Sequence, residues 1–369
     1  MTQRTTPPFR ADHVGSLLRT PALKAARERR ARNEIDAEAF NAIEDREVAD
    51  VIAKQEAAGL QLITDGESRR VSWNIDFLER LDNVESYASE RKIKFQTSGP
   101  QPRAVLLRLT GKLGTYKPHP MIEHFKFLRN HTKRTPKMTI PSPSSLHFRY
   151  GRDAVPETLY PAMEDRDLGQ SYRKVVRAFA DAGCCYLQLD EVNLAYLCDP
   201  SLRKAIADRG EDPARLPATY AGMINAAIAG IPSDMTITMH LCRGNFRSNF
   251  VASGGYEPVA ELFFNTINVH GYFMEYDTER AGGFEPLRFV PKGKTVVLGL
   301  VTSKTGALES KDAVKRRIEQ ATKFIALDQL CLSPQCGFAS TEEGNVLAED
   351  EQWAKLRMIV ELAEEIWCG

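Results

Sequence analysis

The chain has 369 residues, 43% of them hydrophobic, and its 49 lysines and arginines are balanced by 49 aspartates and glutamates. A formal net charge of zero creates no broad electrostatic field, which argues against nucleic acid or an anionic membrane as partner and favours small molecules. The first residues lack the apolar core of a signal peptide, and no later stretch reaches the ~20 apolar residues of a spanning helix. We therefore expect a cytoplasmic protein whose seven cysteines are reduced.

Short apolar runs alternate with longer amphipathic stretches, the pattern of a parallel sheet covered by helices. Eight strands are expected, near residues 11–17, 59–66, 136–142, 183–190, 234–242, 270–276, 294–301 and 328–335. Helical spacing is found over residues 36–59, 168–183, 213–230, 258–269, 310–327 and 349–367. The sequence therefore predicts an α/β fold, a (β/α)8 TIM barrel, formed by one catalytic domain over residues 1–369.

Two segments do not belong to this repeat. Residues 84–115 lie between the second and third expected strands and predict a β-hairpin insertion within the domain. The basic run over residues 24–32 could suggest a nucleic-acid site, but it is short and is followed by Glu34, Asp36 and Glu38. A solvated helix face is the better interpretation of that run.

Polar residues gather where the expected strands end. In TIM barrels the chemistry lies at the carboxyl ends of the strands. Val14, Gly15 and Ser16 end the first strand, Glu67 follows the second and Asp190 ends the fourth. Each has a structural alternative, since the glycine-serine pair and the Asp65-Gly66 dipeptide can be plain turns and Asp190 can cap a helix. Together they predict a polar pocket with acidic walls.

Four further residues suggest a metal site. His240 and Cys242 are two positions apart on an extended strand, so their side chains point to the same side. Alone, the pair could equally be a strand with a small buried thiol. Glu275 and Cys336 end two later strands and add a carboxylate and a second thiol. Donors scattered over several strands, without a Cys-x-x-Cys pair, indicate catalytic rather than structural zinc.

These residues resemble the C-terminal catalytic barrel of the cobalamin-independent methionine synthases, which have the fold shared with uroporphyrinogen decarboxylase. The resemblance runs over nearly the whole chain, through His13-Val-Gly-Ser16, Asp65-Gly-Glu67, Gln188-Leu-Asp190-Glu191, His240-Leu-Cys242, Glu275 and Cys336-Gly337. The N-terminal barrel of that family is absent, so the chain is similar to a single-barrel subgroup. The resemblance implies that His240, Cys242, Glu275 and Cys336 bind Zn²⁺.

The resemblance also implies a reaction. Glu67 and Asp190 would hold the amino group of homocysteine or a close analogue, while Val14, Gly15 and Ser16 meet its carboxylate. A metal-bound thiol loses its proton at neutral pH, and the thiolate would attack the methyl group of a second substrate to give methionine. The donor is expected to be methyltetrahydrofolate or a methylcorrinoid. A homo-oligomer or an accessory protein that delivers the methyl group would be compatible with this scheme.

The chain departs from the family pattern at two places. Where the family stacks the pterin of folate on a tryptophan, this chain has Phe148, and where the family has a proton-shuttling Asp and His, it has Lys304. Phe148 is thus expected in the donor site and Lys304 in proton transfer. The alternative function is a zinc-dependent thiol alkyltransferase or lyase that adds coenzyme M to an epoxide, with Lys304, Arg243 and Arg247 on its sulfonate. Glu67 and Asp190 favour the first function, because coenzyme M has no ammonium group.

Overall fold

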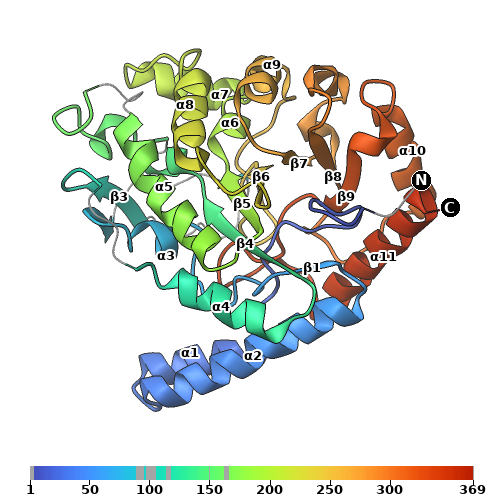
Figure 1. Ribbon diagram of the computed structural model, residues 1–369, viewed down its shortest axis with the longest axis horizontal. Helices are drawn as coiled ribbons and strands as arrows, with labels where there is room; N and C mark the ends of the chain where they lie inside the picture. Colours follow the sequence, from blue (N-terminus) through green and yellow to red (C-terminus); the bar gives the residue numbers. More distant parts are fainter. Residues whose placement is uncertain are drawn as a thin grey trace.

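A curled, seven-stranded parallel sheet forms the centre of the computed structural model, which describes residues 4–88, 95–96, 105–113, 118–148, 150–161 and 166–368 (Figure 1). The strands follow one another in space in the order β1 (Leu62–Ile63), β4 (Thr135–Pro141), β5 (Tyr186–Glu191), β6 (Thr236–Leu241), β7 (Gly271–Glu275), β8 (Thr295–Val301) and β9 (Leu330–Pro334). Apart from the first residues of β4 and β6, all their positions are buried. Strands that are covered on both faces read as nearly continuous apolar runs, which is why the sequence reveals them.

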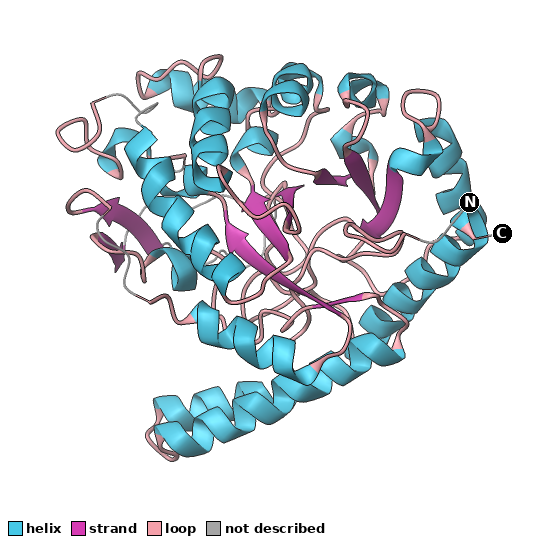
Figure 2. Ribbon diagram, in the orientation of Figure 1, coloured by secondary structure: helices cyan, strands magenta, loops and turns pink. Residues whose placement is uncertain are grey.

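Helices surround the sheet (Figure 2). Those that agree with the expected helical ranges are α2 (Ala37–Ala57), α5 (Arg166–Asp181), α8 (Leu216–Ile228), α9 (Glu257–Thr266), α10 (Lys311–Ala321) and α11 (Glu349–Trp367). The helix predicted for the basic run is α1 (Pro21–Ala31), and the structure adds α3 (Ile75–Leu78), α4 (Met121–His131), α6 (Asn193–Tyr196) and α7 (Pro200–Asp208). The expected α/β fold with a parallel sheet is confirmed.

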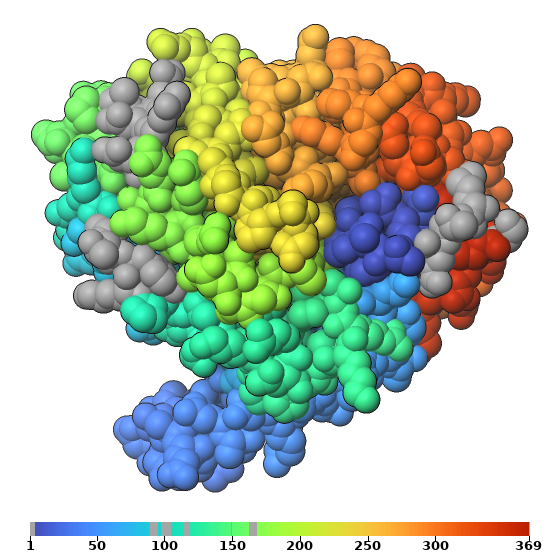
Figure 3. All heavy atoms as spheres, in the orientation of Figure 1, coloured from blue at the N-terminus to red at the C-terminus, as the bar shows by residue number. Residues whose placement is uncertain are grey.

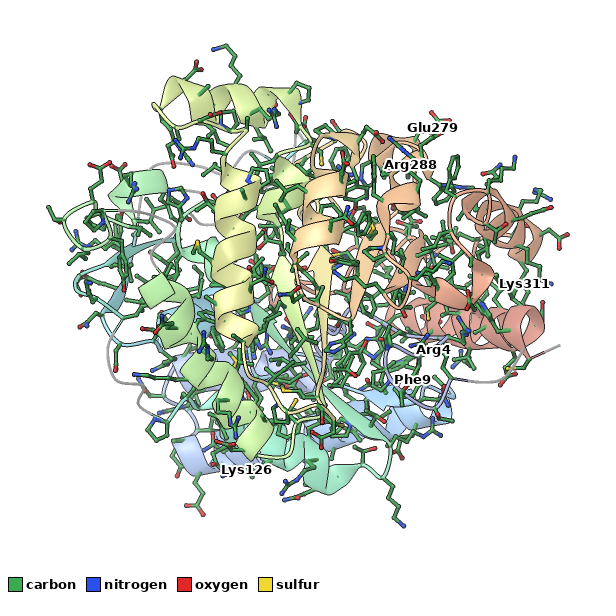
Figure 4. The ribbon with its side chains drawn as sticks, turned by 45° about the horizontal axis from the view of Figure 1, so that its top comes forward. Arg4, Phe9, Lys126, Glu279, Arg288 and Lys311 are labelled. Atoms are coloured by element: carbon green, nitrogen blue, oxygen red, sulfur yellow. The ribbon has the colours of Figure 1, made fainter. Side chains whose placement is uncertain are left out.

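The outer surface carries the charged residues of the helices. Figure 4 places Lys126 of α4 and Lys311 of α10 at the periphery, with side chains filling the space between helices and sheet. Helix α1 and the first part of α2 form a lobe that protrudes from the rest of the molecule (Figure 3). No helix in the described part of the chain is both long enough and apolar enough to cross a membrane.

The expected strand near residues 11–17 is not formed. Ala11 makes only an isolated parallel bridge with Leu332 of β9, and on the other side Leu17 N donates a hydrogen bond to Gly66 O at 3.0 Å. Gly15 explains the difference, because it has φ +139° and a Cβ atom there would lie 2.6 Å from Cγ2 of Thr139. The segment therefore lies between β9 and β1 as irregular chain that approaches β4 closely.

A buried ion pair fastens this segment to the sheet. Nζ of Lys137 on β4 lies 3.0 Å from Oδ1 of Asp12 and donates to His13 O at 2.6 Å, and the hydroxyl of Tyr186 donates to Oδ2 of Asp12 at 2.9 Å. Burial raises the pKa of Asp12 and lowers that of Lys137, and each partner opposes that shift in the other. Each charge thus stabilises the other in a site without water contact.

Replacing Lys137 with methionine should destabilise the fold by about 3–5 kcal/mol, because Asp12 would remain as a buried charge without its partner. Urea unfolding measures the loss. The double variant with Asp12→Asn should recover much of it, since no uncompensated charge is then left. An unchanged midpoint for Lys137→Met would contradict this role of the pair.

The expected hairpin insertion is described only in part. β2 (Val84–Ala88) and β3 (Val105–Leu109) pair antiparallel in a separate two-stranded sheet between β1 and β4 in the sequence. Most residues that connect them, 89–94 and 97–104, lie outside the described residues. The insertion over residues 84–115 as a whole therefore stays a prediction.

Candidate metal centre

Four buried donor side chains meet at the carboxyl ends of three strands. His240 lies in β6 and Cys242 directly follows it, Glu275 is the last residue of β7, and Cys336 comes two residues after β9. One ligand atom from each lies within 4.8 Å of the ligand atoms of the other three, and Sγ of Cys242 is 3.4 Å from Sγ of Cys336. The structure thus brings together the four residues that the sequence singles out.

The unpaired donors of this cluster fit a metal ion. Both ring nitrogens of His240 are buried without a hydrogen-bond partner among the described residues, an arrangement that is costly unless another group binds them. The neighbouring thiol of Cys242 and the imidazole of His240 lower the pKa of Cys336 to about 5, although burial opposes this. Thiolate is the form of cysteine that ligates metals. One imidazole nitrogen, two sulfur atoms and one carboxylate oxygen are therefore available to one ion.

Glu275 has partners of its own behind the cluster. Its Oε1 accepts a hydrogen bond from the backbone N of Arg243 at 2.7 Å, and its Oε2 pairs with Nη2 of Arg280 at 2.7 Å. Burial would raise the pKa of Glu275, but Arg280 and, to a smaller extent, Lys304 lower it, so the carboxyl is ionised. A carboxylate held in this way remains neutralised when it leaves a metal, and Glu275 is therefore suited to be a replaceable ligand.

A cavity of about 600 Å³ lies in front of these donors. His240, Cys242 and Cys336 line it, and four residues expected at the pocket also line it, namely Val14, Ser16, Glu67 and Asp190. Gly15 lies between two of them and makes the close approach to Thr139 described above. The polar residues at the ends of the first, second and fourth expected strands thus face the same space as the candidate metal ligands.

Two buried carboxylates, those of Glu67 and Asp190, line this cavity. Oε1 of Glu67 accepts a hydrogen bond from Thr139 Oγ1 at 2.8 Å and lies 3.6 Å from Nη1 of the buried Arg70. Oε2 of Glu67 has no hydrogen-bond partner among the described residues. Oδ1 of Asp190 accepts from Nε2 of Gln188 at 2.7 Å. Burial and the charge of Glu67 raise the pKa of Asp190 to about 7. An ammonium group bound in the cavity near both carboxyl groups would favour the ionised form of each.

Phe148 and Lys304 are not among the described residues that line the cavity. Phe148 is 6% exposed and packs in the core, with its ring centroid 5.6 Å from that of Tyr196 and 6.3 Å from that of Tyr220. Nζ of Lys304 donates to Oδ1 of Asn245 at 3.2 Å, and Asn245 itself lines the cavity. The lining of the cavity therefore does not support the roles that the resemblance implies, contact with the methyl donor for Phe148 and proton transfer for Lys304.

Other lining residues were missed by sequence reasoning. Trp73 and Asn74 come from one loop and residues 340–343 from another, and Tyr196 and Asn245 also line the cavity, together with three of the candidate metal ligands. The two loops are joined by an antiparallel bridge between Ser72 and Thr341 and by a hydrogen bond from Trp73 N to Ser340 O at 2.9 Å. Irregular loops carry no periodic signal, so only the folded chain reveals that they meet.

Comparisons with known proteins agree with this architecture. The family described as "Cobalamin-independent synthase, Catalytic domain" matches residues 9–365. YxjH of Bacillus subtilis (strain 168), a protein of uncharacterised function, is 48% identical over 364 residues that cover 98% of this chain and 95% of YxjH. A 5-methyltetrahydropteroyltriglutamate–homocysteine methyltransferase of Mycobacterium leprae (strain TN) is 23% identical over 98% of this chain, but the match covers only 43% of that longer protein.

Solved structures give the same result. A protein of Listeria monocytogenes, described as a candidate vitamin B12-independent methionine synthase, aligns with a TM-score of 0.77 and 41% identity over 99% of both chains. A B12-independent methionine synthase from Shewanella sp. W3-18-1, solved with selenomethionine, shares the fold with a TM-score of 0.69 at 19% identity over 96% of each chain. The chain therefore belongs to the family of cobalamin-independent methionine synthases, of which it spans the catalytic domain.

Proposed function

We propose that the protein is a zinc-dependent methyltransferase that moves a methyl group to the thiol of homocysteine or a close analogue, giving methionine, with residues 1–369 acting as one catalytic domain. The observation that carries the proposal is a cluster of two thiols, an imidazole and a carboxylate beside a cavity that two buried carboxylates, Glu67 and Asp190, also line. Asp190 of β5 lies next to His240 of β6 in the register of the two strands. Nitrogen and thiolate ligands with one displaceable carboxylate suit zinc in a catalytic site. Zinc bound there would supply the charge that holds the substrate thiol as a thiolate.

The residues of the chain would position the substrate. Glu67 and Asp190 bind the ammonium group, because two buried carboxylates are more stable with a cation between them. The hydroxyl of Ser16 and the backbone at Val14 and Gly15 meet the substrate carboxylate. Glu275 would be the ligand that an incoming thiol replaces, and its hydrogen bonds from Arg243 N and Arg280 would hold the carboxylate in either state. Holding the thiol and the methyl group in one cavity supplies much of the acceleration.

The methyl donor is a separate question. Methyltetrahydrofolate and a methylcorrinoid are the donors that the family resemblance implies. Relatives that are named for a folate donor match this chain at 23% identity and are more than twice as long. Their donor can therefore be carried over only as a hypothesis to be tested.

The alternative function, addition of coenzyme M to an epoxide, has less support. It needs cationic side chains for a sulfonate, and the residues expected for this are Arg243, Arg247 and Lys304. None of them is among the described residues that line the cavity, and the guanidinium of Arg243 is buried over the ring of Tyr256 instead. Two carboxylates in the cavity would also repel the sulfonate.

Removing the metal should leave a folded but inactive protein. Cys242 and Cys336 are two members of a large hydrophobic core that continues through the strands and the surrounding helices, so we expect the far-UV circular dichroism and the urea midpoint to change little. Methyl transfer should fall by at least ~100-fold and return when zinc is added. Unfolding on chelation would indicate structural zinc, and full activity without metal would contradict the proposal.

A further inference from the structure

We infer that Arg19 and Gly337 are positioning residues that fix the distance between a head-group site and the candidate metal ligand Cys336, and that this distance selects homocysteine over the shorter thiol cysteine. The head-group site consists of Ser16 and Glu67, which are expected at the carboxylate and the ammonium group of the substrate. The inference rests on the proposed function and names what determines the length of the thiol that the site accepts. Two independent contacts carry it.

The first contact is the buried guanidinium of Arg19, which is 3% exposed and joins three segments of the chain. Its Nη1 lies within hydrogen-bond distance of three carbonyl oxygens, those of Leu17 at 2.8 Å, Ala339 at 3.1 Å and Gly66 at 3.2 Å. Its Nη2 donates to Arg70 O at 3.2 Å. Burial lowers the pKa of Arg19 to about 10, so the side chain is charged at neutral pH, and hydrogen bonds from a charged donor are strong. One side chain thus ties the segment before α1 to the loops that follow β1 and β9.

Each of these segments carries a residue of the site. Ser16 belongs to the first, Glu67 to the loop after β1 and Cys336 to the loop after β9, and all three line the cavity. Arg19 is not among the described residues that line it, so the guanidinium acts on the site through the backbone that it binds. Loss of its hydrogen bonds should therefore let the head-group site and Cys336 move relative to each other.

The second contact places the head-group site against the neighbour of Cys336. A Cβ atom on Gly337 would lie 1.9 Å from Oγ of Ser16, which is closer than real Cβ atoms approach. Phe338 N donates to Ser16 O at 2.9 Å, and Ala339 N donates to Ser16 Oγ at 3.4 Å. A side chain at position 337 would have to turn the Ser16 hydroxyl away or move the segment that carries it. Either change alters the distance between the carboxylate site and Cys336.

A fixed distance between two binding points selects a substrate by its length. The sulfur of a thiol amino acid would be bound at the metal ligands, while its carboxylate and ammonium group are bound at the head-group site. Cysteine has one methylene fewer than homocysteine and reaches both points only if they move closer together. A missing methylene is worth about 10–200-fold in a binding pocket, and a misplacement of about 1 Å can cost about 10²-fold. Loops that are no longer joined should therefore lose the preference for homocysteine before they lose affinity for thiols in general.

Arg19→Lys tests the first contact, because lysine keeps the charge but has only one nitrogen for four carbonyl oxygens. Calorimetry on zinc-loaded protein measures binding of homocysteine, cysteine and 2-mercaptoethanol, which lacks the head group. We expect the natural protein to prefer homocysteine to cysteine at least tenfold. Arg19→Lys should reduce this ratio at least fivefold and change the affinity for 2-mercaptoethanol less than twofold. An unchanged ratio, or an equal loss for all three thiols, would overturn the inference, since a purely structural arginine would affect them alike.

The matched control is Arg10→Lys. Arg10 is 7% exposed and donates to the carbonyls of Asp328 and Leu330, at the end of β9 opposite to the one that Cys336 follows. The control removes a comparable set of buried hydrogen bonds, so its stability should fall while its preference for homocysteine stays that of the natural protein. The same loss of preference in both variants would overturn the inference.

Gly337→Ala tests the second contact and decides the outcome if Arg19→Lys does not fold. The added methyl group displaces the Ser16 hydroxyl, so homocysteine should bind at least tenfold more weakly, while 2-mercaptoethanol binding and a zinc content of about one ion per chain should not change. Gly222→Ala adds the same group on α8, where no atom of the described residues lies within 4 Å, and should change none of these quantities. Undiminished homocysteine binding in Gly337→Ala would overturn the inference.

The natural protein separates failure of the inference from failure of the proposed function. If it binds no homocysteine in the presence of zinc, the proposed function is overturned and the inference with it. If it binds homocysteine and cysteine equally, or if its preference is the same in the variants, only the role of Arg19 and Gly337 is overturned.

Discussion

Cys336→Ser should lose its bound metal and its methyl transfer activity while keeping its fold. Sγ of Cys336 lies 3.4 Å from Sγ of Cys242 and within 4.8 Å of the donor atoms of His240 and Glu275, so its removal leaves three donors for an ion. The residue is also the cysteine of the cluster whose pKa is lowered, to about 5. Loss of even an outer-shell partner of a metal ligand costs about 10–100-fold in affinity or activity, so loss of a thiolate ligand should cost at least ~10³-fold.

The matched control for this variant is Cys331→Ser. Cys331 lies in β9, five residues before Cys336, is equally buried and does not belong to the cluster. Metal analysis should give about one zinc per chain for the control and close to none for Cys336→Ser, with similar circular dichroism for both. A Cys336→Ser protein that keeps stoichiometric zinc and activity would show that the cluster is not the metal site.

Asp190→Asn should bind homocysteine much more weakly and still bind zinc. The substitution keeps the size of the side chain and its hydrogen bond with Gln188 but removes one of the two charges that face an ammonium group. Truncating one partner of a buried charge pair costs about 2–5 kcal/mol, so KM for homocysteine should rise about 100-fold. Glu67→Gln should also weaken homocysteine binding, because Oε2 of Glu67 has no hydrogen-bond partner among the described residues and can bind the ammonium group.

The substrate provides the control for this prediction. A thiol without an amino group, such as 4-mercaptobutyrate, should react at similar rates in Asp190→Asn and in the natural protein. Asp208→Asn, at an exposed position of α7 that pairs with Lys204, should change neither substrate's KM. If KM for homocysteine is unchanged in Asp190→Asn, the acidic pair does not recognise an amino acid, and the case for homocysteine over other thiols is lost.

The strands and the metal cluster could be predicted from the sequence for the same physical reason. A buried parallel strand is a run of apolar residues that ends abruptly in the sequence. The polar residues at or just after the carboxyl ends of these strands lie on the side of the sheet where the cavity is. The structure brings His240, Glu275 and Cys336 into one cluster and places Glu67 and Asp190 in the lining of the cavity, and their roles stay predictions. The segment over residues 11–17 has the same alternating pattern as a strand, but Gly15 and its contact with Thr139 give it an irregular path that no periodicity shows.

The sequence did not allow us to predict which loops line the cavity. Residues 71–76 and 340–343 come together only because two loops pair through Ser72 and Thr341. The position of Phe148 in a family motif did not reveal its direction, which depends on packing against Tyr196 and Tyr220 from two different helices. Lys304 likewise follows an expected strand, but its amine turns to Asn245. Motif position thus predicts which element carries a residue, and packing decides which side it faces.

Zinc-edge X-ray absorption tests most directly whether the metal binds and activates the substrate thiol. The zinc-loaded protein should show one nitrogen, one oxygen and two sulfur scatterers, with the sulfur atoms at ~2.3 Å. On addition of homocysteine we predict a third sulfur at about the same distance and the loss of the oxygen, as Glu275 gives way. A zinc shell that keeps two sulfur atoms with saturating homocysteine would contradict the account.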